Sequence, residues 1–300
     1  MMNRESRGKG MEVLVARHSG FCPGVKRAIR MAEKLLENRG KAWSLGPVIH
    51  NPRVVKELEE KGLEILPADP RLWDELELEG EAVLIRSHGI GPALLEELQR
   101  RGAEVVDATC PKVRRAQRVD EDLVRRGYHL VIVGNPEHPE VAAIVEGLPH
   151  PPTVLSSPEK AAEWAGSASL PTRVAVTAQT TAGEEVFRRI VELLASRIPE
   201  MKVVDTLCEV TKRRQREAAE LARRADMVIV VGGRNSSNTR QLARIALECG
   251  SPVMQVEKAE ELDESAIEGK GRIAVMGGAS TPKEEVDKVV RRLEGLRPRR

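Results

Sequence analysis

Three cysteines stand at equivalent places along the chain and could bind a metal together. Cys22, Cys110 and Cys208 each follow an apolar run and precede a basic stretch, within VLVARHSGFCPGVKRA, AEVVDATCPKVRRA and MKVVDTLCEVTKRR. They lie 88 and 98 residues apart. A zinc finger or zinc ribbon needs cysteine pairs only a few residues apart. The spacing therefore indicates one site assembled from three distant segments.

The chemistry of three thiolates favours an iron–sulfur cluster, with zinc as the second candidate. A thiol at the start of a helix has a lowered pKa, and the thiolate is the form that binds metals. A structural zinc site would normally close its fourth position, whereas a cluster with three protein ligands leaves one iron free for a substrate. Soft sulfur ligands disfavour magnesium and calcium. Cys249 has no counterpart in the other copies, and we interpret it as a buried structural cysteine.

Six further loops carry hydroxyl, amide and imidazole groups, mostly near glycines and before predicted helices. Such loops and helix starts bind phosphate groups readily, so we expect a small phosphorylated or diphosphorylated ligand. Neither G-x-x-x-x-G-K-[ST] nor G-x-G-x-x-G occurs, so ATP and dinucleotides lack their usual motifs. The candidate residues are His50, His88, His138, Glu140, Gln179, Thr180, Thr181, Ser236, Ser237, Asn238, Ser280 and Thr281.

Two carboxylates in one of these loops need a chemical reason. Glu137 and Glu140 flank His138 in the segment EHPE, where a carboxylate would repel an anionic ligand. Delivery of a proton is the natural role, because a general acid must lie within hydrogen-bond reach of a leaving group. Spacing alone does not choose between the two residues.

The elements that must position these loops are short apolar strands alternating with amphipathic helices, which is typical of parallel α/β structure. The predicted strands are 13–16, 42–45, 82–85, 104–106, 130–133, 174–176, 202–204, 227–231 and 272–275. The predicted helices include 25–38, 53–61, 93–101, 113–126, 141–146, 184–196, 212–224, 239–249 and 283–293. Functional residues of open α/β sheets collect beyond the carboxyl ends of the strands, where all nine loops fall.

The order of the loops recurs three times, each cycle running through a cysteine loop, a second loop and a third loop. A repeat of roughly 90–100 residues is too long for a solenoid. It predicts three similar α/β subdomains arranged about a pseudo-threefold axis, which would turn the nine loops toward one centre. The expected subdomains are 11–109 with Cys22, His50 and His88; 110–207 with Cys110, His138, Glu140 and Thr180; and 208–296 with Cys208, Ser236, Ser237, Asn238 and Ser280.

Composition excludes several classes of protein. The 300 residues include 48 Lys or Arg and 46 Asp or Glu, a net charge of +2, and only 2% aromatic residues, which disfavours nucleic-acid binding. The longest apolar strand-like run, 227–231, is far shorter than the roughly 20 residues of a membrane span. The N-terminus lacks a secretory signal, so we expect a cytoplasmic protein whose cysteines stay reduced.

Nine motifs, in order, resemble the IspH/LytB family from about residue 13 to 293. They are GFCPGVKRAI, VIHNPRVV, SHGIGP, DATCPKV, HPEV, AQTT, DTLC followed by TKRRQ, GRNSSNT and GASTP. The ordered set is highly specific, although each motif alone is not. One departure is Val210, where the family pattern C-x-A-T-x-x-R-Q has alanine; it concerns the packing of that helix rather than the metal site.

The resemblance implies a trefoil of three α/β subdomains around a [4Fe–4S] cluster bound by Cys22, Cys110 and Cys208. It implies reductive dehydroxylation of 4-hydroxy-3-methylbut-2-enyl diphosphate to isopentenyl and dimethylallyl diphosphate, the last step of the non-mevalonate isoprenoid pathway, with electrons from ferredoxin or flavodoxin. It selects Glu140 as the proton source and places Thr180 near the substrate hydroxyl, with Gln179 and Thr181 in support. The diphosphate would be held by His50, His88, His138, Ser236, Ser237, Asn238 and Ser280.

Two other functions remain open from the sequence. A redox-neutral hydro-lyase with a three-cysteine cluster would act on a small phosphorylated substrate without any reductant. A non-catalytic, zinc-stabilised sensor of phosphate ligands would hold zinc without sulfide. Neither alternative needs a membrane or nucleic acid.

Overall fold

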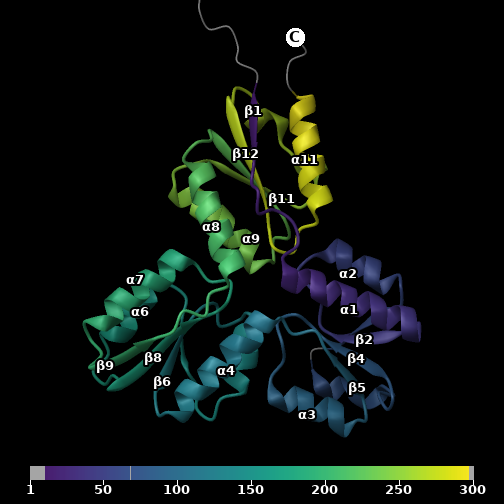
Figure 1. The fold of residues 1–300 in the computed structure, drawn as a ribbon, viewed down its shortest axis with the longest axis vertical. Coiled ribbons are helices and arrows are strands. Elements are labelled where there is room, and N and C mark those ends of the chain that lie inside the picture. The colour runs from purple at the N-terminus through teal and green to yellow at the C-terminus, as the bar shows by residue number, and fades with distance from the viewer. Residues whose placement is uncertain (1–10, 68, 297–300) are drawn as a thin grey trace, which may run out of the picture. The chain divides into compact units, whose positions relative to one another are not determined.

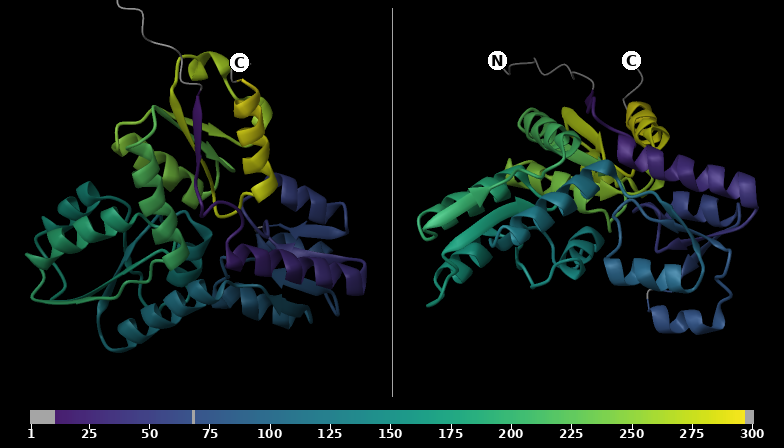
Figure 2. Two further views of the ribbon diagram at one scale, coloured as in Figure 1. Left: turned by 45° about the horizontal axis from the view of Figure 1, so that its top comes forward. Right: turned by 60° about the horizontal axis from the view of Figure 1, so that its bottom comes forward.

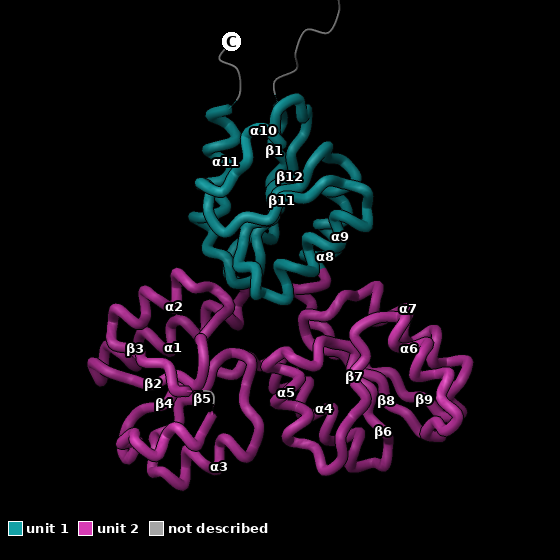
Figure 3. Tube along the Cα trace, turned by 180° about the vertical axis from the view of Figure 1, so that it is seen from behind, with its two compact units in different colours: residues 1–21, 213–300 teal, residues 22–212 magenta. Residues whose placement is uncertain are grey.

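The structure is a computed structural model that describes residues 11–67 and 69–296 (Figure 1). The chain divides into two compact units, which Figure 3 draws in different colours. Unit 2 comprises residues 22–212, and unit 1 comprises the described residues before and after that range.

The sheets are all parallel, and each has four strands. In unit 2, the first sheet has the order β3 (Leu63–Leu66), β2 (Ala42–Leu45), β4 (Ala82–Ile85), β5 (Glu104–Asp107). The second has the order β7 (Thr153–Leu155), β6 (His129–Val133), β8 (Arg173–Ala178), β9 (Glu200–Val203). In unit 1 the order is β11 (Val253–Val256), β10 (Met227–Val231), β12 (Arg272–Gly277), β1 (Glu12–Val15). The three orders are equivalent, which confirms the prediction of three similar α/β subdomains.

Each sheet contains one strand that the sequence did not predict, and in each case it is an edge strand. These strands are β3, β7 and β11, each of which pairs with a single neighbour. Their residues are partly exposed, unlike the fully buried β4 and β10. Such a strand lacks the continuous apolar run by which a central strand is recognised. The opposite edge strands β5, β9 and β1 were predicted because each precedes one of the repeated cysteines.

One strand belongs to a different sheet from the one expected. We placed residues 13–16 at the start of the first subdomain, 11–109, but β1 pairs with β12 in unit 1. The reason lies in the repeat: the strand before each cysteine completes the sheet of the preceding cycle. Thus β5, before Cys110, pairs with β4, and β9, before Cys208, pairs with β8. The first cycle has no predecessor, so its strand joins the last sheet.

Helices cover both faces of each sheet (Figures 1 and 2). Those of unit 2 are α1 (Pro23–Arg39), α2 (Pro52–Glu59), α3 (Pro92–Arg100), α4 (Pro111–Arg125), α5 (Pro139–Glu146), α6 (Pro158–Ala165) and α7 (Glu184–Ala195), with the 3₁₀ turn η1 (Pro70–Glu75). Unit 1 has α9 (Ser237–Glu248), α10 (Glu264–Ile267), α11 (Lys283–Gly295) and the 3₁₀ turn η2 (Ala259–Glu261), and α8 (Glu209–Ala222) begins in unit 2 and ends in unit 1. No helix among the described residues has the length and apolar character needed to cross a membrane.

The sheet of β6 to β9 shows how strand alternation builds the core. Leu130 and Ile132 pack with residues of α4 and α5 on one face, whereas Val131 and Val133 pack with residues of α6 and α7 on the other. Both faces are buried, which explains why β6 reads as a continuous apolar run rather than as alternating polar and apolar residues.

Proline fixes where the first six helices begin. Each of α1 to α6 has proline at its start, where the missing N–H costs no hydrogen bond. The residue before the proline therefore becomes the N-cap. Three of these N-caps are predicted functional residues, namely Cys22, Cys110 and His138.

Candidate metal centre and anion site

The three cysteines of the predicted metal site all lie in unit 2, at the starts of helices. Cys22 and Cys110 cap α1 and α4, and Cys208 immediately precedes α8. The Val25 amide donates to Cys22 Sγ at 3.4 Å. All three side chains are partly buried and none forms a disulfide. Each thiol is therefore held at a helix start with its sulfur available to a ligand.

The three thiols are close enough to act on one another electrostatically. Burial raises the pKa of Cys110, the amides of Lys112 and Val113 lower it, and the charges of Cys22 and Cys208 raise it further. The net shift is upward, so the expected lowering of the pKa at a helix start is wrong for Cys110, because burial outweighs the two amides. Three sulfurs that repel one another as thiolates are a group that a bound cation would stabilise.

Gly24 makes room for this group. A Cβ at position 24 would lie 2.7 Å from Cys110 Sγ and 3.9 Å from Cys22 Sγ. The first turn of α1 therefore passes directly beside Cys110, which a larger residue would prevent. Three free thiols of soft donor character, gathered beside a backbone without a side chain, fit a thiolate-bound metal centre or iron–sulfur cluster.

Backbone hydrogen bonds tie two of the cysteines to the loops of the predicted anion site. The Cys110 amide donates to the Ser87 carbonyl at 2.9 Å, and the Cys208 amide donates to the Thr180 carbonyl at 2.9 Å. Ser87 precedes His88, and Thr180 is itself a predicted site residue. The two bonds are equivalent in the repeat, so the same architecture places both cysteines beside both third loops.

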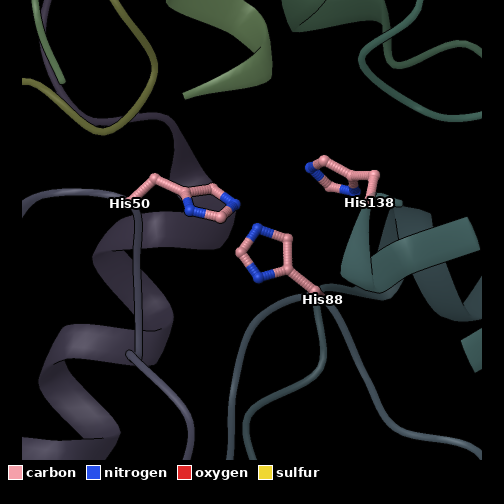
Figure 4. Close-up of side chains that lie close together, drawn as sticks. All are labelled: His50, His88 and His138. Carbon is pink, nitrogen blue, oxygen red and sulfur yellow. The ribbon is translucent and has the colours of Figure 1, made fainter. Parts of the chain in front are cut away.

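Three histidines from three loops of unit 2 converge on one point (Figure 4). His50 follows β2, His88 follows β4, and His138 follows β6. The ring centroids of His50 and His88 are 4.4 Å apart, those of His88 and His138 5.3 Å, and those of His50 and His138 5.6 Å. The prediction that these loops bring their imidazoles together is thus realised within one unit.

His138 is arranged to donate a hydrogen bond rather than to ligate a metal. Their ring nitrogens lie within 4.8 Å of one another, close enough for a shared ion. However, His138 Nδ1 accepts a hydrogen bond from the Glu140 amide at 3.2 Å, which leaves the proton of a neutral ring on Nε2. A metal would need a lone pair at that nitrogen, whereas an anion would accept its proton.

Burial keeps the central histidine neutral. The pKa of His88 lies well below its usual range because of burial, and then because of the positive charges of His50, His138 and Arg86. An anion bound among these groups would reverse the electrostatic part of this shift. A bound anion would therefore favour the protonated form of His88.

Arg86 is a site residue that the sequence reasoning missed. It follows β4 directly, is partly buried, and has an Nε without a hydrogen-bond partner among the described residues. Gly46, with a φ of 75°, accommodates it, since a Cβ there would lie 2.7 Å from Arg86 Nη1. The sequence feature that could have identified Arg86 is its position, as a basic residue directly after a wholly apolar strand.

Glu140 and Thr180 form a buried acid–hydroxyl pair. Glu140, at the start of α5, is 1% exposed. Its Oε1 accepts from the Thr180 amide at 2.6 Å, and its Oε2 lies 2.8 Å from Thr180 Oγ1. Burial raises the pKa of Glu140 to about 7, although both bonds from Thr180 lower it. Glu137, by contrast, is exposed, so of the two carboxylates in this loop Glu140 is the one with the environment of a general acid at neutral pH.

Gln179 and Thr181 connect the loops on either side of this pair. Gln179 Oε1 accepts from the Asn135 amide at 3.1 Å, and its Nε2 donates to Thr181 Oγ1 at 2.7 Å. Gly134 allows the approach, since a Cβ there would lie 2.8 Å from Gln179 Cβ. These contacts agree with the supporting role predicted for both residues.

Asp120 is a second buried carboxyl that the sequence did not reveal. It lies on the buried face of α4 with Val113, Ala116 and Leu123, and is 1% exposed. Neither oxygen has a well-formed hydrogen bond within the described structure. Burial raises the pKa of Asp120 to about 7; Thr177 lowers it, and the charges of Glu140 and Glu121 raise it. Its position in an apolar helical stripe offers no sequence signal of function.

Replacing Asp120 with asparagine is expected to stabilise the protein at neutral pH. The folded pKa of about 7 exceeds the ordinary value of 3.8, so the cost of ionisation grows as pH rises between these values and is complete above them. This difference between the folded and ordinary pKa corresponds to a loss of about 4 kcal/mol in the free energy of unfolding once the carboxyl is fully ionised. Between about pH 4 and pH 8, the variant's advantage in unfolding temperature should widen by about 5 °C or more, as followed by circular dichroism. The exposed neighbour Glu121→Gln should show little widening, and a gap independent of pH would contradict the assignment.

The remaining predicted residues lie in unit 1, at the carboxyl ends of β10 and β12. Ser236 caps α9 by accepting from the Thr239 amide at 3.3 Å, which leaves its hydroxyl proton free to donate. Asn238 is 3% exposed, and neither atom of its side-chain amide has a hydrogen-bond partner in the described chain. A buried amide without a protein partner can be satisfied by ordered water or by a ligand. Ser237 begins α9, and Ser280 follows β12.

Thr281 has a structural role instead. Its hydroxyl donates to the Val231 carbonyl at 2.9 Å, and the side chain is buried. This bond joins the loop after β12 to the end of β10. The loop that follows β10 carries Ser236. Thr281 therefore shapes the loop rather than facing a ligand.

Comparisons with known proteins identify the family of this chain. The family model described as LytB protein matches residues 13–294. A 4-hydroxy-3-methylbut-2-enyl diphosphate reductase of Geobacter sulfurreducens is 42% identical over 285 residues, which cover 95% of this chain and 97% of the relative. The enzyme of the same name from Aquifex aeolicus is 39% identical over 287 residues, 95% of this chain and 97% of that one.

Two solved structures share the fold. One, described as (E)-4-hydroxy-3-methyl-but-2-enyl diphosphate reductase, the terminal enzyme of the non-mevalonate pathway, is 38% identical with a TM-score of 0.65, covering 95% of this chain and all of that chain. The Plasmodium falciparum reductase is 24% identical with a TM-score of 0.86, covering 94% of this chain and 87% of that chain, and supports the fold alone. With a family model and relatives matched over nearly its whole length, the chain belongs to the LytB family.

Proposed function

We propose that the chain reduces 4-hydroxy-3-methylbut-2-enyl diphosphate to isopentenyl diphosphate and dimethylallyl diphosphate. The observation that carries this proposal is the joint presence, in unit 2, of three mutually interacting thiols and the buried Glu140–Thr180 pair. The relatives named above bear the same activity in their names. The overall change breaks one C–O bond, consumes two electrons and two protons, and releases water.

Cys22, Cys110 and Cys208 would hold the metal centre, for which we propose a [4Fe–4S] cluster. When bound, such a cluster supplies electrons one at a time and an iron that can take a substrate oxygen. Free thiols must stay reduced to bind it, so the proposal places the protein in a reducing compartment such as the cytoplasm. The electron source is a one-electron carrier of the ferredoxin or flavodoxin kind.

The histidines of unit 2 would bind the diphosphate. His138 offers an Nε2–H, and the ring of His88 lies near those of both His50 and His138, at 4.4 and 5.3 Å between centroids. Ser236, Ser237, Asn238 and Ser280 are the proposed contacts from unit 1. Their buried and partly buried donors provide positioning, which lowers the barrier by fixing the substrate relative to the reacting groups.

Glu140 would supply the proton to the departing hydroxyl. With a pKa of about 7 it is largely protonated below neutral pH, and its burial excludes water as a competing proton source. After the proton leaves, the Thr180 amide and hydroxyl stabilise the carboxylate that remains. Because the Thr180 hydroxyl is bonded to Glu140, it would also orient the acid toward the substrate oxygen.

The decisive experiment is purification without oxygen followed by metal and sulfide analysis and a turnover assay. We expect brown protein containing iron and labile sulfide, and conversion of the diphosphate substrate only when a reductant such as dithionite is added. Turnover without reductant would indicate a hydro-lyase instead. Zinc without sulfide would indicate a phosphate-ligand sensor and would overturn the proposal.

A further inference from the structure

A groove of unit 2 runs along α4 and β9, outside the site described above. Its cavity is about 490 Å³, and we call it the α4 groove. It is lined by Pro111, Arg114, Arg115, Arg118, Val119, Asp122, Leu123, Arg126, Lys202 and Val204. Five of these residues are basic and one is acidic, although the chain as a whole carries a net charge of only +2. The positive charge is therefore concentrated locally.

Part of this charge is unneutralised. Arg114 pairs with Asp107, and Arg126 pairs with Asp122 at 2.8 Å. For Arg115, Arg118 and Lys202 the described structure shows no ion pair, and both arginines are exposed. On α7 and α9, by comparison, two of the four exposed basic residues lie in helical ion pairs, Arg188 with Glu185 and Arg244 with Glu248. Three cations without partners on one face form a surface to which an acidic partner is attracted.

The groove also has an apolar floor. Val119 and Val204 are partly buried in it and Leu123 is buried. Apolar residues surrounded by charged ones are the usual anatomy of protein interfaces. Small, charge-steered interfaces are typical of weak electron-transfer encounters, in which the partner must leave after each delivery.

The place of the groove fits electron delivery. It begins at Pro111, the residue after Cys110, which caps α4. Arg115 and Arg118 lie five and eight residues beyond Cys110, which corresponds to about 7.5 and 12 Å along the helix axis. Electron transfer slows steeply with distance, so a carrier seated here would be favourably close to the thiol group.

We propose that the α4 groove is the docking surface for a small acidic electron-carrier protein, whose carboxylates meet Arg115, Arg118 and Lys202. This inference rests on the proposed function, since only a reductase needs two electrons per turnover. A nucleic acid would also be attracted by positive charge. However, three free cations in a groove of this size fit a local acidic patch better than a long phosphate backbone, which needs many contacts.

The test compares charge reversal in the groove with a matched reversal elsewhere. The groove variant is R115E/R118E in the cluster-loaded protein. The control is R30E/K34E on α1, where both residues are exposed and Arg30 lies eight residues beyond Cys22, as Arg118 lies eight beyond Cys110. Both variants change the charge by the same amount. The probe is a recombinant flavodoxin with an acidic surface.

With flavodoxin as the donor, we expect kcat/KM of the groove variant to fall about tenfold or more, and that of the control to stay within about twofold. Flavodoxin binding, measured by titration calorimetry, should weaken in parallel, and its dependence on salt should flatten. With dithionite as the donor, all three proteins should turn over at similar rates and show the same visible absorption.

Unchanged flavodoxin binding in the groove variant, or an equal loss in the control, would overturn the docking proposal. A groove variant that loses its dithionite rate or its visible absorption would contradict it as well, because the residues would then support the metal centre rather than a partner. The milder R115A/R118A variant repeats the comparison with less disturbance of the helix. Failure of the wild type with dithionite would instead refute the proposed function, so the two failures are distinguishable.

Discussion

Glutamine at position 140 is expected to abolish most turnover while leaving the metal centre and substrate binding intact. Glutamine has nearly the same shape, and its Oε1 can still accept from the Thr180 amide, as Glu140 does at 2.6 Å. It cannot release a proton. General acids contribute about 10²–10⁴ in rate, so we expect kcat to fall at least about 100-fold with KM changed little. Steady-state assays with dithionite measure both constants.

The pH dependence gives an independent check on the same residue. Glu140 has a pKa of about 7, so its acid form predominates below that value. The kcat of the wild type should therefore decline as pH rises through about 7, and the residual rate of Glu140→Gln should lack this decline. Glu137→Gln, three residues earlier and exposed, is the matched control and should keep the full rate. Normal turnover by Glu140→Gln would remove the proton-donor role.

The second large effect concerns the metal centre. Replacing Cys110 with serine is expected to remove bound iron and sulfide and to reduce activity to background. Cys110 is within electrostatic reach of both Cys22 and Cys208 and lies directly beside Gly24. A hydroxyl is a hard, weakly acidic ligand that does not replace a thiolate. Iron and labile sulfide per chain, together with the visible absorption, measure the loss.

Cys249 provides the control for that experiment. It ends α9, and its Sγ lies 3.9 Å from the Ala219 carbonyl, within a cluster of apolar residues. Cys249 is partly buried rather than fully buried as expected, and its packing against this cluster agrees with a structural role. Cys249→Ser should keep the iron content and the rate. If Cys110→Ser retained iron and sulfide at the level of Cys249→Ser, the three-cysteine centre would be wrong.

Much of the fold could be predicted because the chain repeats its own pattern. The buried central strands appear as apolar runs, and the prolines that open α1 and α4 fix Cys22 and Cys110 as N-caps. The edge strands β1, β5 and β9 could be predicted because each precedes a repeated cysteine, whereas β3, β7 and β11 lack that marker and are short and partly exposed. The partner of β1 could not be read locally, since sheet pairing depends on which edge is vacant.

Some features of the site could likewise be predicted from the sequence, and others could not. The convergence of His50, His88 and His138 follows from equivalent loops at equivalent strand ends. The burial of Asp120 and the net rise in the pKa of Cys110 depend instead on how closely neighbouring elements pack. The burial of a side chain, and the pKa shift that burial causes, cannot be predicted from residue type or spacing. Both require the structure.

The pairing of β1 with β12 has a consequence for the newborn protein. Glu12 faces Arg272, 260 residues later in the chain, so the ribosome releases β1 long before its partner exists. Unit 2, whose two sheets use only residues between 22 and 212, can form in the meantime. Contacts between such remote segments close slowly, and an unpaired strand is prone to aggregate. The N-terminal strand β1 is therefore among the last to reach its place in a sheet. Until then, it is the segment that a chaperone would need to protect.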